Sequence, residues 1–195
     1  MTLFRRGYIF IDGGYLRSIV VREFIARPDI AEDPILFSTF LKLFGEKYWK
    51  SFSGIEINRL LYYDGIIPSD KDLEEHNKML NFFNELRTQL DYFDVRLGDL
   101  IRDSQGKLKQ KGVDVLISVD MVIKAFLNHY DVAILIAGDR DFVPAVRAVR
   151  ELTGKYVYCI YAYKHIADEL LRIVDISLPI VKDDLKEIAE KISTY

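Results

Sequence analysis

Two aspartates follow a long aliphatic run in the second half of the chain, at the point where that run ends. The run covers residues 132–137, and Gly138 separates it from Asp139 and Asp141. A continuous aliphatic run without polar alternation predicts a strand covered on both faces, which is typical of a parallel α/β sheet. In open sheets of this kind ligands bind beyond the carboxyl ends of the strands. We therefore expect Asp139 and Asp141 to lie in the functional site of the protein.

The same pattern occurs near the start of the chain. Residues 8–11 form a short apolar run that ends in Asp12, and two glycines follow it. Glycines at this point let the backbone turn tightly after the strand. The pattern predicts that Asp12 also stands at the carboxyl end of a strand.

A third group of acids lies in a segment with helical periodicity, residues 113–129, which is apolar almost all round and is therefore predicted to be largely buried. It contains Asp114 in its opening turn and Asp120 six residues later. A buried carboxylate is costly unless it is paired, hydrogen-bonded or bound to a cation. Asp114 has a structural alternative as a partner of the helix dipole, and Asp120 has one as an ion pair with Lys124.

Taken together, these acids point to metal-assisted chemistry. In a doubly wound fold, acids at two strand ends and at a helix start would converge on one crevice, and several like charges there need a cation. Carboxylates without histidine or cysteine partners favour Mg²⁺ or Mn²⁺ over zinc or copper. An acidic site of this kind suits phosphodiester hydrolysis, in which metal ions stabilise the attacking and leaving oxygens.

Aspartates at strand ends also occur in three other classes of protein. Phosphatases of the haloacid dehalogenase type need a second Asp two residues after the first, and here Gly14 holds that place. A Toprim domain pairs an Asp-x-Asp strand end with an early Glu, where this chain has Asp12, so this reading is weakened but stays open. A response-regulator receiver needs a lone phosphorylatable Asp and a later strand-end Lys, and neither is evident.

Elements that could position these acids alternate along the chain. Strands are predicted at residues 7–12, 55–64, 92–97, 132–137 and 156–162, and helices at residues 14–26, 35–50, 70–90, 113–129, 142–152, 164–172 and 182–192. This alternation predicts a three-layer α/β fold with a central five-stranded parallel sheet flanked by helices. We expect the strand that starts near Tyr8 to lie between those that end at Asp64 and Ala137. Residues 98–112 form a polar linker that contains glycine.

Composition limits the class of protein. The 195 residues are 50% hydrophobic and 13% aromatic, which fits a single globular domain with an adequate core. A net charge of −3 argues against a surface that is basic overall and binds nucleic acid non-specifically, although a local basic patch is compatible with this net charge.

The single cysteine, Cys159, excludes an intrachain disulfide and is predicted to be a buried, inert thiol. Asp12 interrupts the N-terminal apolar run, so we expect no signal peptide or membrane span and a cytoplasmic protein.

The acidic motifs together resemble a known family. Residues 10–13, residues 111–114 with Asp120 six positions on, and residues 137–144 are similar to an NYN domain of the LabA/DUF88 type, a relative of PIN-domain nucleases. The resemblance extends from about residue 7 to about residue 175. It implies a three-layer PIN-like (Rossmannoid) fold, a site that binds Mg²⁺ or Mn²⁺, and ribonuclease activity on RNA. We accordingly expect an NYN/PIN-like domain over residues 1–178 and a C-terminal helical extension over residues 179–195.

The resemblance also assigns roles to individual residues. It implies that four aspartates are both catalytic and metal-binding, namely Asp12, Asp114, Asp139 and Asp141, and that Asp120 is a further metal-binding position. Family members often carry Asn shortly after the first Asp, whereas Gly14 and Tyr15 stand here. Arg140 replaces a residue that is commonly small, and it would contact a phosphate or quench the site.

RNA binding requires positive charge near the acids, because neutralising phosphates supplies most of the affinity. Lysines alternate just before Asp114, and the candidate substrate-binding residues are Arg17, Lys107, Lys109, Lys111 and Arg140. A solvated loop is the structural alternative for the lysines. The sequence thus predicts a metal-dependent ribonuclease that acts on single-stranded RNA. The alternative is a non-catalytic PIN-like module that binds RNA or acts as a scaffold through a degenerate acidic site.

Overall fold

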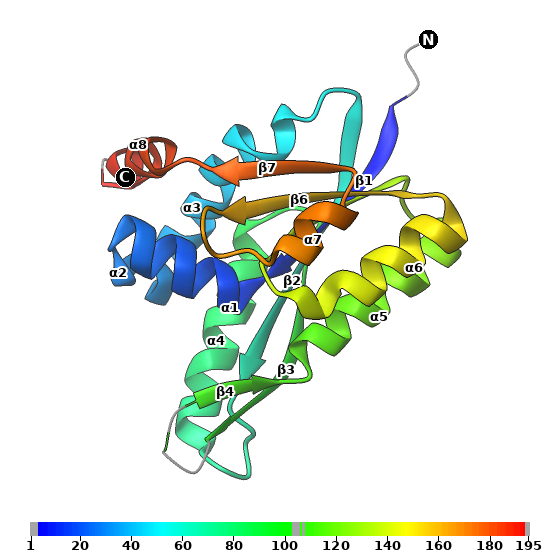
Figure 1. The fold of residues 1–195 in the computed structure, drawn as a ribbon. Coiled ribbons are helices and arrows are strands. Elements are labelled where there is room, and N and C mark those ends of the chain that lie inside the picture. The colour runs from blue at the N-terminus through cyan, green and yellow to red at the C-terminus, as the bar shows by residue number, and fades with distance from the viewer. Residues whose placement is uncertain (1–3, 103–105, 107, 194–195) are drawn as a thin grey trace.

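A computed structural model describes residues 4–102, 106 and 108–193 of the chain, and it contains one mixed sheet (Figure 1). The strands of this sheet are β1 (Arg5–Asp12), β2 (Ile55–Ile66), β3 (Phe93–Arg102), β4 (Leu108–Lys111), β5 (Val132–Ile136), β6 (Tyr156–Ala162) and β7 (Ile176–Ile180). Their order across the sheet is β4-β3-β2-β1-β5-β6-β7. All neighbours are parallel except β3 and β4, which form an antiparallel hairpin.

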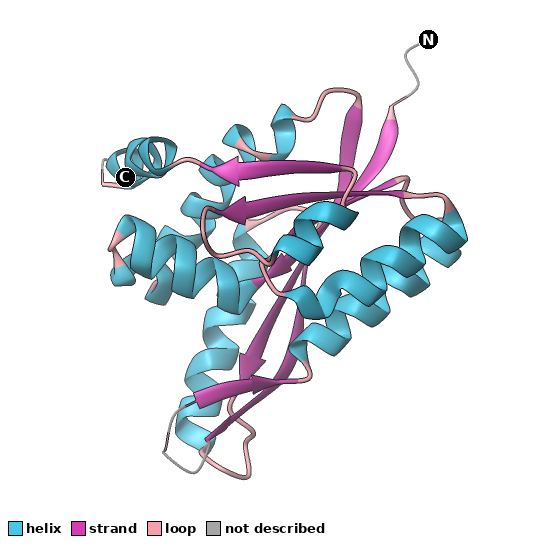
Figure 2. Cartoon of the chain, viewed as in Figure 1, coloured by secondary structure: helices cyan, strands magenta, loops and turns pink. Residues whose placement is uncertain are grey.

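Helices cover both faces of this sheet (Figure 2). One face carries α1 (Gly13–Tyr15), a π-helical segment (Leu16–Ile25), α2 (Pro28–Glu32), α3 (Pro34–Lys47), a 3-10 turn (Trp49–Ser51), α4 (Leu73–Gln89) and α8 (Lys182–Ile192). The other face carries α5 (Val113–Phe126), a 3-10 turn (Arg140–Phe142), α6 (Val143–Thr153) and α7 (Asp168–Ile173). The hydrophobic core accordingly forms two layers, one on each side of the sheet.

The predicted α/β architecture is confirmed, but the sheet has seven mostly parallel strands and not five. β1 lies between β2 and β5, as expected. Two strands were missed, for different reasons. The predicted linker over residues 98–112 contains the end of β3 and all of β4, whose four residues are exposed and show no apolar face. β7 contains Pro179, which cannot donate a ladder hydrogen bond and is tolerated because β7 is an edge strand.

α5 does not match the prediction of a largely buried helix. Only the residues spaced four apart that face the sheet are buried, namely Val113, Ile117, Met121 and Ala125. A helix in the outer layer of a three-layer fold is covered on one side only, so most of the other apolar side chains of α5 are exposed, whereas Val122 is partly buried against the core. The near-continuous apolar sequence of this helix is therefore not evidence that the helix is buried on all sides.

The C-terminal helix packs against the same core as the helices on its side of the sheet. Leu185, Ile188 and Ile192 of α8 are buried in the core layer that includes α3. The Tyr48 hydroxyl at the end of α3 accepts a hydrogen bond from the Val181 N–H at 3.0 Å. The domain boundary expected between residues 178 and 179 falls inside β7. In the described part of the chain, no helix combines the length and the apolar character that a bilayer crossing requires.

Replacing Leu185 with alanine tests whether α8 unfolds together with the rest of the chain. The side chain is fully buried, so we expect the free energy of unfolding to fall by about 2–5 kcal/mol in a single cooperative urea transition. Lys186→Ala on the exposed side of the same helix is the control, with an expected change within about 0.5 kcal/mol. A small effect of Leu185→Ala would mean that α8 is an independent appendage.

Candidate active site

Asp12 and Asp139 lie at the same edge of the sheet, where the parallel strands end. Asp12 is the last residue of β1, and Asp139 follows β5 after two further residues. β1 and β5 pair in parallel up to Ile11 and Ile136, so their carboxyl ends coincide. The expected convergence of these two strand ends is confirmed.

The turn that carries Asp139 depends on a close backbone approach at Gly138. A Cβ atom at this position would lie 2.0 Å from the carbonyl oxygen of His165 and 2.7 Å from the Tyr15 ring. With a larger residue at position 138, either this turn or the backbone at His165 would have to move. Asp139 then opens a 3-10 turn, and its Oδ1 accepts a hydrogen bond from the Asp141 N–H at 2.9 Å. This contact fixes the orientation of the Asp139 carboxylate.

Asp12 is a buried carboxyl group at the start of a short helix. Only 8% of the residue is exposed, and its Oδ1 accepts a hydrogen bond from the Tyr15 N–H at 3.0 Å. Burial raises the pKa of Asp12 to about 7, and the negative charges of Asp114 and Asp64 act in the same direction, while the Tyr15 N–H offsets part of the effect. Without a cation, Asp12 thus stays partly protonated at neutral pH.

Asp114 connects Asp12 to the pair of aspartates that follows β5. It lies in the first turn of α5. Partial loss of hydration raises its pKa, and the charges of Asp139 and Asp141 raise it further. The charge of Asp114 thus acts on Asp12, and the charges of Asp139 and Asp141 act on Asp114. We call Asp12, Asp114, Asp139 and Asp141 the acidic row.

Asp64 is a fifth carboxylate at this edge, and its sequence pattern predicted only that a strand ends there. It is 4% exposed and fully engaged. Its Oδ2 accepts hydrogen bonds from the Tyr62 hydroxyl at 2.9 Å and from Arg17 at 3.1 Å, and its Oδ1 accepts one from Gln110 at 2.7 Å. The Asp-Gly pair after an apolar run, shared with Asp12, is a signal that could have drawn attention to it.

Arg17, predicted to bind substrate, is committed to this network. Besides Asp64 it contacts the Ala31 carbonyl oxygen through Nε at 3.1 Å, and its guanidinium lies 4.9 Å from the centre of the Phe82 ring. Its side chain is 19% exposed. The structure therefore places Arg17 as the neutralising partner of Asp64, directly behind the acidic row.

Asp120 lies apart from the acidic row. It is six residues beyond Asp114, which is about 9 Å along the helix. Its carboxylate accepts hydrogen bonds from the Tyr63 hydroxyl at 2.7 Å and from Lys124 at 3.1 Å. The ion pair with Lys124 that the sequence offered as the structural alternative is thus present.

Three further basic residues predicted to bind substrate, Lys109, Lys111 and Arg140, lie in the described part of the chain. Lys109 and Lys111 lie on β4, on the face of that strand opposite Gln110, because side chains alternate along a strand. Arg140 is exposed and lines a shallow hollow together with Asp141, Val143, Pro144 and Glu169. Lys107 lies outside the described residues.

The NYN domain profile matches residues 8–180, which includes every strand of the parallel part of the sheet and the whole acidic row. The chain belongs to the NYN domain family. NYN domains are PIN-like nucleases, so a nuclease is the class of protein that the family indicates.

A solved structure supports the fold of this NYN domain. The chain is similar to a protein of unknown function from Vibrio parahaemolyticus RIMD 2210633, with a TM-score of 0.63 and 21% sequence identity over 94% of this chain and 97% of that chain. At this identity the likeness shows the fold alone. A search of curated proteins finds no match.

Tyr15, where many NYN domains carry Asn, has a clear structural task in this chain. Its hydroxyl donates a hydrogen bond to the His165 carbonyl oxygen at 2.9 Å and accepts one from the Ala162 N–H at 2.7 Å. The side chain thereby ties the turn after β1 to the end of β6. The amide side chain nearest to this turn is Gln110, whose atoms lie 2.7 Å from where a Gly14 Cβ would stand.

The acidic row fits a hard divalent cation by its donor chemistry. Among the described residues, no three acidic, histidine or cysteine side chains are grouped closely enough to hold a metal ion by themselves. A Mg²⁺ site needs less, because Mg²⁺ keeps several waters and is held by one or two carboxylates together with substrate phosphates. The row offers carboxylate oxygens only, and the pKa of Asp12 is raised first by burial and then by the charges of Asp114 and Asp64.

The buried Asp12 carboxyl predicts a specific dependence of stability on pH. In the folded protein its pKa is about 7, whereas in the unfolded chain it is near 3.8, so the folded state binds more protons between these values. The contribution of Asp12 to stability therefore falls as the pH rises from about 4 to 7 and is constant above that. In chelator, Asp12→Asn should be more stable than the wild type at pH 8, by on the order of 3 kcal/mol, and the difference should shrink at pH 5.

Urea denaturation at pH 5 and pH 8 measures this difference. Asp91→Asn, at an exposed position, is the matched control and should show the same small effect at both values of pH. Equal effects of Asp12→Asn at pH 5 and pH 8 would contradict the raised pKa.

Proposed function

We propose that this NYN domain, of the LabA/DUF88 type, is a ribonuclease that hydrolyses RNA phosphodiester bonds with Mg²⁺ or Mn²⁺. The observation that carries the proposal is the acidic row, in which burial and the charge of Asp114 raise the pKa of Asp12, and partial burial with the charges of Asp139 and Asp141 raises the pKa of Asp114. Clustered groups with perturbed pKa values are typical of functional sites. Membership of a nuclease family makes phosphodiester hydrolysis the matching reaction.

We propose different roles for the four aspartates of the acidic row. Asp12 and Asp139 each have one carboxylate oxygen held by a backbone N–H, which presets their orientation before any ligand binds. Asp114 and Asp141 complete the negative charge that would attract a cation. A bound divalent cation supplies the Lewis acidity that phosphodiester hydrolysis needs. A cation bound beside Asp12 would lower the pKa of its carboxyl group, so that Asp12 would be ionised at neutral pH and release its proton to solvent.

Asp120 is assigned to the ion-pair network of α5 and not to the cation, because Tyr63 and Lys124 already satisfy its carboxylate. Lys109, Lys111 and Arg140 are proposed to contact the phosphates of a single-stranded RNA. Lys107 is a further candidate on sequence grounds alone. A cytoplasmic location agrees with the single, buried Cys159.

Neutralising the row should abolish cleavage and leave the fold intact. We expect Asp12→Asn and Asp139→Asn to lower the rate at which single-stranded RNA is cut in Mn²⁺ or Mg²⁺ by at least about 100-fold, because the amide keeps the shape but loses the charge. Asp120→Asn should retain most of the activity. Melting temperatures with and without Mn²⁺ provide a second measurement, since a cation that binds the native state raises the melting temperature of the wild type and not that of Asp139→Asn.

Two results would count against this assignment. An equal Mn²⁺ shift in wild type and Asp139→Asn would show that the cation does not bind at the row. RNA binding without cleavage in either cation, on single-stranded and structured substrates, would favour a non-catalytic module.

Replacing Lys109 and Lys111 with glutamine should weaken RNA binding in a salt-dependent way. For single strands the logarithm of the binding constant falls with the logarithm of salt concentration by about 0.7 per neutralised phosphate, so losing two contacts should reduce the slope by about 1.4. Fluorescence anisotropy titrations at several salt concentrations between roughly 50 and 300 mM measure this slope. Lys50→Gln with Lys186→Gln, away from β4, is the matched double control, and an unchanged slope in the Lys109/Lys111 variant would remove β4 from the RNA interface.

A further inference from the structure

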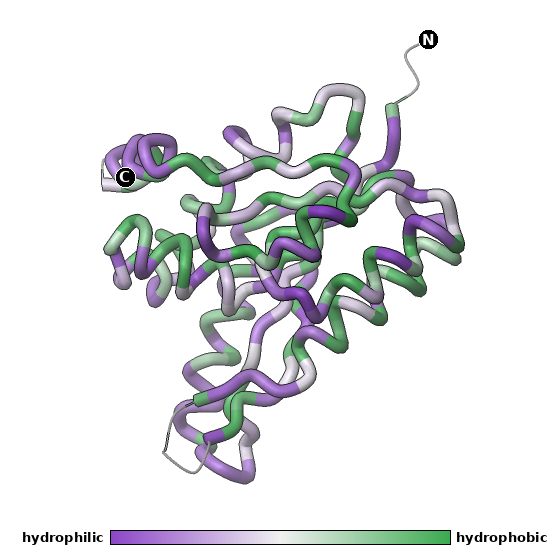
Figure 3. Tube along the Cα trace, viewed as in Figure 1, coloured by the Kyte–Doolittle hydropathy of each residue, from purple (hydrophilic) through white to green (hydrophobic). Residues whose placement is uncertain are grey.

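α5 presents an unusually apolar face to the outside of the molecule. Large hydrophobic side chains along its full length are between 38% and 63% exposed, namely Val115, Leu116, Val119, Ile123, Phe126 and, just past the helix end, Leu127. We call these six residues the α5 face. Figure 3 shows hydrophobic residues recurring along this helix. Isolated apolar side chains on a surface need no explanation, but a contiguous group on one helix does.

The spacing of the α5 face is that of a helix that packs against another helix. Leu116, Val119, Ile123 and Phe126 follow one another at intervals of three, four and three residues. This is the repeat that forms the seam of a two-helix interface, in which side chains of one helix fill the gaps of the other. The buried residues of α5, which face the sheet, lie on a different side of the helix. The seam is therefore additional to the packing that holds α5 in the fold.

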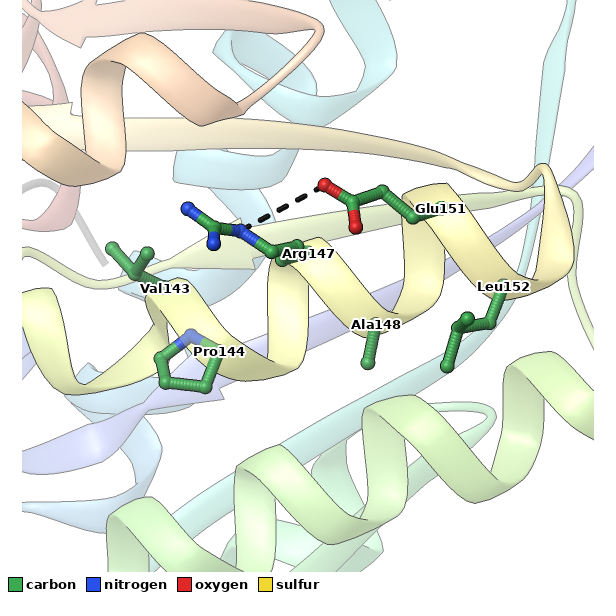
Figure 4. Close-up of a pocket in the computed structure, with 6 residues that line it drawn as sticks. All are labelled: Val143, Pro144, Arg147, Ala148, Glu151 and Leu152. Carbon is green, nitrogen blue, oxygen red and sulfur yellow. Dashed lines mark ion pairs between the residues drawn. The ribbon is translucent and has the colours of Figure 1, made fainter.

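The apolar surface continues from α5 onto α6, which lies beside it (Figure 1). Pro144, Ala148 and Leu152 recur every four residues along α6 and line a shallow groove. In Figure 4 their side chains point from α6 toward the neighbouring helix, and Leu152 is 67% exposed. The two charged residues of this groove, Arg147 and Glu151, form an ion pair with each other at 3.8 Å.

The size of this surface is what a stable dimer needs. Side chains of these kinds, at the exposures of the α5 face and Leu152, present about 700 Å² together, close to the roughly 800 Å² per partner of a standard protein interface. The largest apolar patch on a typical monomer is only about 300–600 Å².

Charge on α5 is compatible with a second copy of the same helix. Its three charged residues are Asp114, which belongs to the acidic row, and the pair Asp120 and Lys124, which neutralise each other. The α5 face itself carries no charge, so it is complementary to itself. A self-complementary patch is the requirement for a two-fold symmetric dimer.

We propose that the chain forms a homodimer in which α5 packs antiparallel against α5 of a second copy. In this arrangement Val119 lies against the partner's Ile123, and Leu116 lies against the partner's Phe126. A parallel arrangement would bring the two Asp114 carboxylates and the two helix N-termini together, which like charges oppose. The antiparallel arrangement separates the two acidic rows, so each site stays complete within its own chain.

Measurement of the molar mass in solution tests the dimer. We expect the wild type to have twice the mass of the chain in light scattering or sedimentation, and Ile123→Glu to be a monomer at the same concentrations. Leu73→Glu, at a position on α4 that is 62% exposed, is the matched control and should remain a dimer. Circular dichroism and the melting transition confirm that each variant is folded. A monomeric wild type, or an Ile123→Glu variant that stays dimeric, would overturn the proposal.

Disulfide trapping tests the antiparallel arrangement without a disruptive charge. A mixture of Val119→Cys and Ile123→Cys chains should give cross-linked heterodimers under mild oxidation, whereas each variant alone should cross-link much less. The native Cys159 is fully buried and does not contribute. Efficient cross-linking of Val119→Cys with itself would show a parallel pair and overturn this arrangement.

Discussion

The parallel pairing of β1 with β2 on one side and with β5 on the other is the constraint on which the acidic site depends. Because these strands run in the same direction, their carboxyl ends meet at one edge, and the residues that follow them converge. Two close backbone contacts complete the arrangement. Gly138 lets the turn before Asp139 touch the His165 carbonyl group, and the Tyr15 hydroxyl joins the turn after β1 to the same region.

An Asp-Gly pair stands at or near the carboxyl end of two neighbouring strands, β1 and β2, and the surroundings of the two carboxylates differ. Asp64 is surrounded by donors, with Arg17 as its cationic partner, so its charge is balanced within the fold. Asp12 is also buried, but its donors are the uncharged backbone N–H groups of Tyr15 and Gly14 and its charged neighbours are acidic, so its charge is not balanced. The difference separates a structural ion pair from a group that gains a great deal from an external cation.

The sequence was sufficient to predict the elements that are buried on both faces, because burial requires apolar residues on both. The five central strands follow from apolar runs that alternate with helical segments, and the shared edge of Asp12 and Asp139 follows from two such runs that end in acids. It was insufficient at the edges. β4 has no apolar face, β7 contains Pro179, and the apolar α5 is half exposed, because an outward face that binds another surface has the same composition as a buried one. The role of Asp64 depends on Arg17 and Gln110, which are distant in sequence.

The central place of β1 in the sheet has a consequence for how the chain is made. Within this sheet β1 is synthesised before the other strands, yet its second partner, β5, begins only at Val132. At ordinary translation speeds of about 5–20 residues per second, this strand waits on the order of ten seconds with one edge unpaired. During that time residues 9–11, which are fully buried in the finished protein, are exposed to other nascent chains. The topology that assembles the acidic row thus also leaves an apolar strand with an unpaired edge, which favours aggregation, until β5 has been synthesised.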